Sequence, residues 1–296
     1  MYAEACELQR AMYQQSITRA HRGAFIFLLD GSGSMAEEVY FRGRQTTKSE
    51  VLATITNELL FELIERARRS EGIRDYYDIA VLGYSGSDQV CSLLPHTEGF
   101  CSVVELANEQ PPLRTRLVEY RLPDGGISLR EVPTPSWITP CASGQTPMGE
   151  AFRYARDLAK EWVMQSDHAQ SFPPVFFNIT DGEATDANEE ELRALSHEIR
   201  SLRTADGGVL LINIHIAGAD TPRSIFFPSQ EEAAYPHRYA SLLYDCSSPM
   251  PEVFNQAIRE VKGPGAMPPF RGMSYNASTA DLIAMLNIGS ISVKTE

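Results

Sequence analysis

The feature that most limits the fold of this chain is an uninterrupted apolar run, AFIFLLD, at Ala24–Asp30. A run of aromatic and branched residues without polar alternation is typical of a strand buried on both faces, as in a parallel sheet covered by helices. Comparable runs occur at Tyr77–Tyr84, Pro174–Thr180 and Val209–Ile216. We therefore expect these four segments to be strands of one sheet.

Helical patterns lie between these runs, over residues 46–69, 146–165 and 186–204. In the first, apolar side chains recur at three- and four-residue spacing, and Thr47 or Ser49 is placed to cap its start. Strands that alternate with helices predict an α/β fold, with a doubly wound, mostly parallel central sheet flanked by helices.

The chain divides around this predicted core. Residues 1–22 are polar and are expected to form a helical lead-in, and residues 23–262 the α/β domain. The last segment, 263–296, begins with a Gly/Pro-rich stretch and is expected to be a linker followed by a short helix. Length is consistent with this division, because 296 residues suffice for one large α/β domain.

Residues 95–140 differ from the rest of the domain because they are rich in Pro and Gly and lack a long helical period. Two β-prone segments, 117–122 and 127–132, flank the turn sequence Pro123-Asp124-Gly125-Gly126, so we predict an insertion that contains a β-hairpin. Further along, we predict a helix at 230–239 and a final short strand at 241–246, and then a helix at 252–261.

Charge and cysteine content exclude several classes of function. Acidic residues outnumber basic ones by 39 to 26, a net charge of -13, which argues against binding to nucleic acid or to an anionic membrane. The five cysteines are scattered and form no CxxC pair, so no zinc ribbon is expected. No signal-peptide pattern and no apolar run of ~20 residues is visible, which predicts a cytoplasmic protein with reduced thiols.

The most informative motif is Asp30-Gly31-Ser32-Gly33-Ser34, directly after the first predicted strand. Open parallel sheets bind ligands at the carboxyl ends of their strands. Two hydroxyls on a glycine-permitted turn, preceded by a carboxylate, offer the oxygen ligands that a hard cation such as Mg²⁺ prefers. The motif therefore predicts part of a divalent metal site.

One loop cannot enclose an octahedral ion, so further oxygens must come from neighbouring strand ends. Thr146 lies where a loop meets a predicted helix, and Asp181 follows the strand that ends at Thr180. Each residue also has an ordinary structural interpretation. Asp30 could cap a turn, and Thr146 could be the N-cap of a helix with Pro147 at its first position.

Three segments, LLDGSGSM, SGQTPMGEAF and ITDGEATD, together resemble the metal-site segments of von Willebrand factor A-type (VWA) domains, in the same order, over roughly 24–262. That family's metal-ion-dependent adhesion site has the pattern DxSxS…T…D. The resemblance implies hydroxyl ligands from Ser32, Ser34 and Thr146, with Asp30 and Asp181 reaching the ion directly or through water. This sequence departs from the pattern in the long gap before Thr146, which the insertion accounts for, and the resemblance also implies that LLYDCSS (242–248) is the last strand.

This ligand set predicts a binding function. Neutral hydroxyls leave an ion electrophilic with one position open, and a carboxylate from a partner protein would fill it. We expect Mg²⁺ in the site, with Mn²⁺ or Ca²⁺ as alternatives, and no catalytic residues. Exposed residues nearby, with Glu37, Glu38 and Glu183 as candidates, would set specificity, although each could be ordinary surface.

Two other functions stay open. A metal-dependent phosphatase or hydrolase is disfavoured because the sequence has no G-x-S-x-G, P-loop or HExxH motif, and because an Asp30 nucleophile would need a second acid and a Lys that its motif does not show. A vestigial site, with contacts made by the insertion or tail, is the third interpretation.

The partner is predicted by resemblance alone. The chain resembles stand-alone bacterial cytosolic VWA proteins of the tellurite-resistance-associated type, although it lacks the zinc ribbon of some of them. The resemblance implies a protein kinase, a PP2C-type phosphatase or a MoxR-type ATPase as partner, in a stress or defence system.

Overall fold

The computed structural model describes residues 12–291, except 96, 122–125, 217–223, 230–231 and 233–237. Among these residues, none of the helices combines the length and the apolar character needed to cross a membrane.

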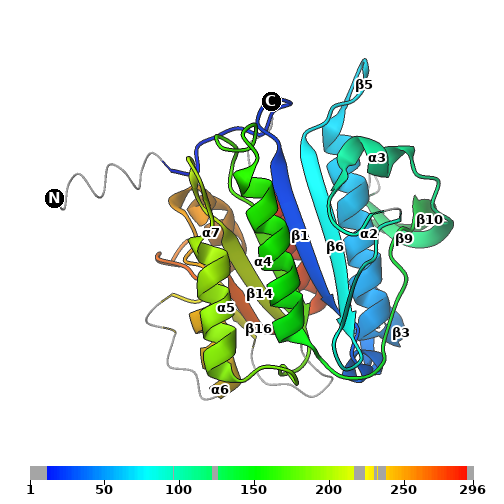
Figure 1. The fold of residues 1–296 in the computed structure, drawn as a ribbon. Coiled ribbons are helices and arrows are strands. Elements are labelled where there is room, and N and C mark those ends of the chain that lie inside the picture. The colour runs from blue at the N-terminus through cyan, green and yellow to red at the C-terminus, as the bar shows by residue number, and fades with distance from the viewer. Residues whose placement is uncertain are drawn as a thin grey trace.

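A central sheet of eight strands forms the middle layer of the molecule (Figure 1). Its order is β15-β16-β14-β11-β1-β6-β7, with β8 also paired to β6. The five strands from β16 to β6 are parallel to their neighbours, and β15, β7 and β8 are antiparallel edge strands. Their bounds are β1 Gly23–Asp30, β6 Tyr77–Ser85, β7 Gln89–Ser92, β8 Cys101–Ser102, β11 Val175–Thr180, β14 Leu210–Ile216, β15 Ile225–Phe226 and β16 Met273–Ala277.

Helices cover both faces of this sheet (Figure 1). One face packs against α2, α3, α7 and α8, and the other against α4, α5 and α6. Their bounds are α2 Lys48–Ala67, α3 Val103–Asn108, α4 Met148–Met164, α5 Glu189–Ser201, α6 Arg238–Cys246, α7 Asn255–Lys262 and α8 Thr279–Ile291, with short 3₁₀ helices at Gly33–Ala36 and Glu252–Phe254. The predicted α/β fold, a doubly wound, mostly parallel sheet, is therefore confirmed.

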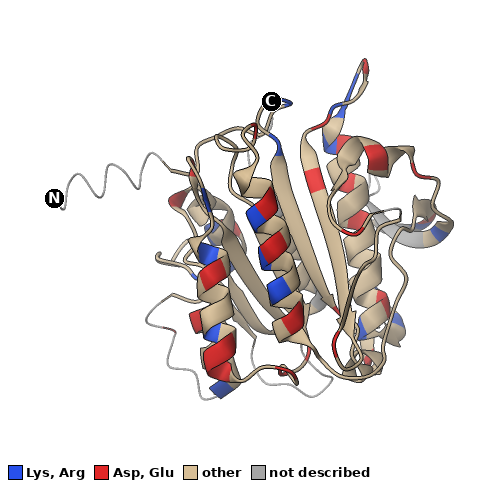
Figure 2. Ribbon diagram, viewed as in Figure 1, with Lys and Arg blue, Asp and Glu red and all other residues tan. Residues whose placement is uncertain are grey.

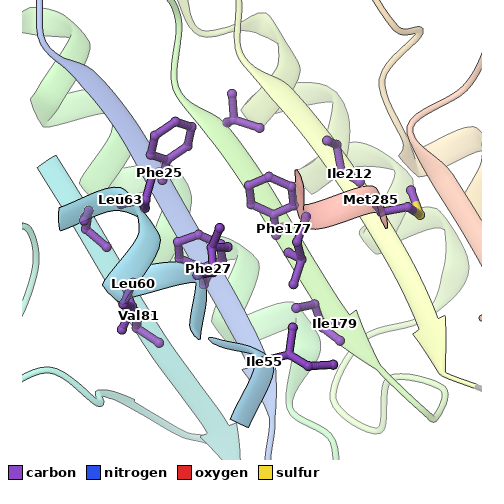
Figure 3. Packing of buried hydrophobic residues seen from close by; sticks show 14 of the residues in the cluster. Phe25, Phe27, Ile55, Leu60, Leu63, Val81, Phe177, Ile179, Ile212 and Met285 are labelled. Atoms are coloured by element: carbon purple, nitrogen blue, oxygen red, sulfur yellow. The ribbon is translucent and has the colours of Figure 1, made fainter. Parts of the chain in front are cut away.

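The central strands are fully buried, as their apolar composition predicts. Every residue of β1 and of β11 is buried, because alternate side chains of each strand point to opposite helical layers. In the core under α2 and α8, Phe27 stacks on Phe177 with ring centroids 5.1 Å apart, and Leu60, Leu63 and Met285 pack around them (Figure 3). Figure 2 shows charged residues along α4 and α5, whose buried residues lie on the face toward the sheet and are almost all apolar, which is the amphipathic arrangement of a covering helix.

The small strands form hairpins outside the central sheet. The predicted hairpin of the insertion is confirmed, with β9 and β10 paired antiparallel, while residues 122–125 of its turn lie outside the described part. It stands beside the helical layer of α2 and α3 (Figure 1). The bounds of these strands are β9 Leu113–Arg121, β10 Ile127–Pro135, β2 Glu38–Phe41, β3 Arg44–Thr47, β4 Arg68–Arg69, β5 Gly72–Ile73, β12 Arg203–Thr204 and β13 Gly207–Gly208.

The short strand predicted near the C-terminus is wrong. The segment 241–246 is part of helix α6 and not a strand, and LLYDCSS is accordingly not the last strand. Tyr239, Leu242, Leu243 and Cys246 are buried at helical spacing, a period that the Leu-Leu pair had obscured. The last strand is β16, within the segment expected to be a linker, so the sheet continues beyond the predicted boundary at residue 262. The predicted helix at 230–239 falls mostly outside the described residues.

The N-terminal lead-in is not helical where the structure describes it, from residue 12 to 22. The carboxylate of Asp206 accepts hydrogen bonds from the backbone N–H groups of Gln14 and Gln15, at 2.9 and 3.2 Å, and the Asp206 carbonyl accepts one from Tyr13 N–H at 2.7 Å. These contacts hold residues 13–15 against the turn at Asp206, and Tyr13 has φ of +60°, which is outside the region of a right-handed helix. Residues 1–11 lie outside the described part.

Candidate metal centre

The predicted site lies where the strand order of the sheet reverses. From β1 the chain crosses to β6 on one side, and later elements add β11, β14 and β16 on the other side. The carboxyl ends of β1 and β11 therefore adjoin at a switch point, where open α/β sheets bind ligands. Asp30 ends β1, and Thr180 ends β11 with Asp181 directly after it.

Asp30 is almost completely buried, with 2% of its surface exposed. Its Oδ1 accepts a hydrogen bond from the Ser32 N–H at 2.8 Å, and its Oδ2 accepts one from the Thr180 hydroxyl at 2.6 Å. Burial raises the pKa of Asp30, while the bonds from Thr180 and Ser32 act in the opposite direction. Asp30 therefore does cap its turn, and it also places a carboxylate under the Ser32–Ser34 loop.

The two serines and Asp181 form a continuous chain of polar contacts. Ser32 Oγ lies 3.0 Å from Ser34 Oγ, and the Ser34 hydroxyl donates to Asp181 Oδ1 at 2.6 Å. Adjacent ligands of an octahedral Mg²⁺ ion, each bonded at about 2.1 Å, are about 3.0 Å apart. The spacing of the two serine hydroxyls thus fits neighbouring positions around such an ion.

Thr146 does not cap helix α4, so the ordinary structural interpretation of this residue is wrong. The helix begins at Met148, and its first N–H groups are satisfied by Asp186, whose carboxylate accepts from Gly149 N–H at 3.0 Å and Glu150 N–H at 2.8 Å. Asp186 was expected to begin the next helix, which instead starts at Glu189. Thr146 itself is buried, and within the described part of the chain its hydroxyl makes no hydrogen bond, so this hydroxyl is available as a ligand.

Thr146 lies close to the serines in space, although the long insertion separates them in the sequence. A Cβ placed on Gly182 would lie 3.6 Å from Thr146 Oγ1 and 4.0 Å from Ser34 Oγ, so both hydroxyls line the space beside this glycine. The loop before Thr146 is pinned by Gly144, whose carbonyl accepts from Gly33 N–H at 3.0 Å. Gly144 has φ of +73°, which favours glycine. A Cβ on Gly144 would also lie only 2.6 Å from the Cα of Gly86.

All five predicted residues, Asp30, Ser32, Ser34, Thr146 and Asp181, therefore gather at one end of the sheet. Two further residues of the site were not predicted. Thr180 supplies the second hydrogen bond to Asp30, and Lys48 Nζ donates to Asp181 Oδ2 at 3.0 Å. A lysine at the first position of a helix, where the dipole disfavours a cation, was the one signal in the sequence that could have pointed to Lys48.

The chemistry of the donors fits a hard divalent cation. Within the described residues, no three His, Cys, Asp or Glu side chains gather closely enough to hold a metal ion. An ion at this place would therefore depend on the hydroxyl oxygens of Ser32, Ser34 and Thr146, together with the carboxylates of Asp30 and Asp181. Oxygen donors without sulfur or imidazole favour Mg²⁺ over a transition metal.

The residues expected to set specificity have different surroundings. Glu37 is ion-paired with Lys48. Glu38, at the start of β2, accepts a hydrogen bond from Gln45 at 2.5 Å, and Glu183 is exposed on the loop after β11. Glu37 therefore contacts the site through Lys48, and Glu183 lies on the same loop as Asp181. Glu38 belongs to the neighbouring hairpin of β2 and β3.

Comparison with solved structures gives partial overlaps. A von Willebrand factor type A protein from Catenulispora acidiphila is similar with a TM-score of 0.38 and 13% identity over 67% of this chain and 33% of that one. The vWF domain of the type V pili tip protein Mfa5 from Porphyromonas gingivalis gives 0.31 and 11%, over 55% of this chain and 39% of that one. An uncharacterised membrane-spanning protein from Vibrio fischeri gives 0.27 and 11%, over 66% and 72%.

These overlaps are loose, and the chain spans about a third of the length of the first protein. No protein-family model matches the sequence, and no curated protein matches it. The α/β assignment therefore rests on the strand order and connections described above.

Proposed function

We propose that this chain is a metal-dependent protein-interaction module. Ser32, Ser34 and Thr146 would hold Mg²⁺, with Asp30 and Asp181 as its anionic neighbours. The bound ion would supply a Lewis-acid centre able to accept a carboxylate from a partner protein. The observation that carries the proposal is the side chain of Thr146, a residue only 5% exposed, whose hydroxyl has no hydrogen-bond partner among the described residues and faces the same space as Ser34.

The hydrogen bonds already made by the carboxylates support this use of the hydroxyls. All four oxygens of Asp30 and Asp181 accept a hydrogen bond from the protein, from Ser32 N–H, Thr180, Ser34 and Lys48. The carboxylates are therefore held in place, which suits contact with the ion through water, and the lone pairs of the hydroxyls are the ligands of first choice.

A thermal-melting experiment tests the metal. If Mg²⁺ binds, a concentration of 100 times its dissociation constant stabilises the folded state by about 2.7 kcal/mol. For a domain of this size we expect the melting temperature to be about 5 °C higher in MgCl₂ than in EDTA. Ser32→Ala should abolish the difference, and Ser143→Ala, on an exposed neighbouring loop, should keep it. Identical melting in MgCl₂ and EDTA would contradict the proposal.

A pull-down from the native host, with and without EDTA, tests the partner. We expect capture of a protein that is lost in EDTA and in Ser32→Ala. A kinase, a PP2C-type phosphatase or a MoxR-type ATPase of a stress or defence system, in the cytoplasm, is the partner class that the VWA resemblance suggests. Capture indifferent to both changes would favour a vestigial site instead.

A phosphatase or hydrolase is the second candidate, because Asp181 and Lys48 supply the acid and the lysine that the Asp30 motif lacked. Against it, both oxygens of Asp30 are hydrogen-bonded and the side chain is buried, so Asp30 is poorly placed to attack a substrate. Turnover of p-nitrophenyl phosphate with Mg²⁺, lost in Asp30→Ala, would favour the enzyme. We expect no turnover.

A further inference from the structure

Lys48 occupies an unusual place for a lysine. It is the first residue of α2 and only 3% exposed, whereas lysine is rarely buried without a partner. The N-terminus of a helix carries partial positive charge, so the helix itself disfavours a cation there. Something other than helix formation must hold this ammonium group in the interior.

Two carboxylates form ion pairs with the Lys48 ammonium group, and they differ in exposure. Lys48 Nζ lies 3.0 Å from Asp181 Oδ2, and the Asp181 side chain is 0% exposed. The second carboxylate is that of Glu37, which is 44% exposed and also accepts the Lys48 backbone N–H through its carbonyl at 3.0 Å. Lys48 is therefore placed between a sealed carboxylate of the candidate metal centre and one that faces solvent.

This arrangement has a consequence for any ion at the serine hydroxyls. Asp181 joins the two, because its Oδ1 accepts from Ser34 and its Oδ2 from Lys48. Like charges repel, and the side chains of Lys48 and Asp181 are only 4% and 0% exposed, so water screens the charge of Lys48 poorly. A divalent cation at Ser34 would therefore meet an opposing positive charge on the far side of the same carboxylate.

We infer that Lys48 is a resident counter-ion of Asp181 that keeps the site folded without metal and weakens its affinity for divalent cations. The inference rests on the proposed function and deepens it. Without Lys48, the two buried carboxylates would cancel the charge of a divalent ion. With Lys48, the buried part of the loaded site keeps one positive charge, which a partner carboxylate can neutralise. Lys48 is thus a positioning residue that favours capture of an acidic partner over tight metal storage.

Calorimetric titration of the full chain with MgCl₂, and with MnCl₂ as a second probe, tests the inference. Lys48→Met removes the charge and keeps most of the volume, and we expect it to tighten Mg²⁺ binding at least tenfold. Its melting temperature should fall in EDTA and rise further on adding Mg²⁺ than that of the natural chain. Lys160→Met is the matched control, because it removes the same charge from an exposed position on α4. It should leave affinity unchanged, and Lys48→Arg should remain within threefold of the natural chain.

Unchanged or weaker Mg²⁺ binding in Lys48→Met would overturn the inference and leave the proposed function standing. If neither the natural chain nor Lys48→Met binds metal, the proposed function fails and the inference falls with it. Should Lys48→Met not fold, Glu37→Gln decides, since it leaves the charge of Lys48 less compensated. It should weaken Mg²⁺ binding at least threefold relative to Glu38→Gln, an exposed neighbouring change away from Lys48. Equal or tighter binding in Glu37→Gln would overturn the inference.

Discussion

The two ends of the central sheet each hold a buried aspartate, Asp30 at the carboxyl end and Asp78 at the amino end. Both carboxylate oxygens of Asp78 accept hydrogen bonds from other side chains. Arg22 donates to its Oδ1 at 3.0 Å, Trp162 Nε1 donates to its Oδ2 at 2.8 Å, and His168 Nε2 lies 3.6 Å away. His168 in turn stacks on Trp162 with ring centroids 4.0 Å apart.

Among the described residues, the hydrogen bonds to Asp30 come from the neutral groups of Ser32 and Thr180, although Asp181 lies in the same site. The amino end is therefore closed, because the protein itself supplies donors to both oxygens of Asp78, although Arg22 is shared with Asp75. The carboxyl end contains the buried side chains of Asp30, Asp181 and Lys48, and beside them Thr146, whose hydroxyl bonds to nothing in the described structure. A buried acid whose partners are all internal indicates structure, and one beside unused oxygen ligands indicates a binding site.

Removing the counter-ion at the closed end should have the largest effect on stability. Arg22→Met leaves Asp78 buried beside Trp162 without its guanidinium, and we expect a loss of about 3 kcal/mol in the free energy of unfolding. Because this end does not involve the metal, urea denaturation should give the same loss in MgCl₂ and in EDTA. Arg19→Met, at an exposed position nearby, is the control. A loss that depends on Mg²⁺ would show that the two ends are coupled.

The next largest effect on stability concerns the start of α4, at the carboxyl end of the sheet, which we call the open end. Asp186→Ala removes the acceptor for two N–H groups, and we expect a loss of about 1–2 kcal/mol in stability. Thr146→Val should cost less than about 0.5 kcal/mol in EDTA, because its hydroxyl bonds to nothing in the described structure, yet it should abolish stabilisation by Mg²⁺. Urea denaturation under both conditions measures this. Equal losses from the two changes in EDTA would show that Thr146 is a structural cap after all.

The difference between the ends also explains what sequence can predict. Asp30, Ser32 and Ser34 are close in the chain, so their spacing alone places them on one turn. Thr146 and Asp181 follow from their positions at a helix start and a strand end, which topology brings to the same edge. Local apolar runs likewise predicted β1, β6, β11 and β14.

Contacts between distant segments could not be predicted. Lys48 meets Asp181 across 133 residues, and Asp186 caps a helix that starts 38 residues before it. Neither pairing leaves a periodic trace, because each needs the finished fold to define the neighbours. The same holds at the amino end, where Arg22 and Asp78 are 56 residues apart. Helix α6 was missed for a different reason, since a short apolar pair fits both a strand and a helix.

A smaller effect is expected from pH at the closed end. Burial raises the pKa of Asp78, and the hydrogen bond from Trp162 and the charge of Arg22 offset this only in part. The folded state therefore binds a proton more tightly than the unfolded chain. The stability that this adds is complete below the unfolded pKa of about 3.9, and it is lost as pH rises through the higher folded pKa.

Melting curves of the natural chain and Asp78→Asn between pH 4 and pH 7 test this sign. The stability of the natural chain relative to Asp78→Asn should fall as pH rises from about 4 and then level off. Asp75→Asn, whose side chain is 40% exposed and also near Arg22, controls for the change in charge. A relative stability that rises with pH would mean that Arg22 outweighs burial at this end.

Thiol labelling, which needs no substitution, should distinguish the amino end of the sheet from its carboxyl end by the reactivity of one cysteine at each. Cys101 pairs with Ile79 near Asp78, and burial, with Glu105 nearby, raises its pKa to about 11. Cys141 is exposed at the open end, with its Sγ 3.9 Å from the Gly31 carbonyl oxygen. At pH 8 only about one Cys101 in a thousand would be thiolate. Iodoacetamide followed by mass spectrometry should therefore modify Cys141 well before Cys101. Comparable labelling of both cysteines would mean that the amino end of the sheet opens often enough to expose Cys101 to the reagent. The amino end would then not be closed.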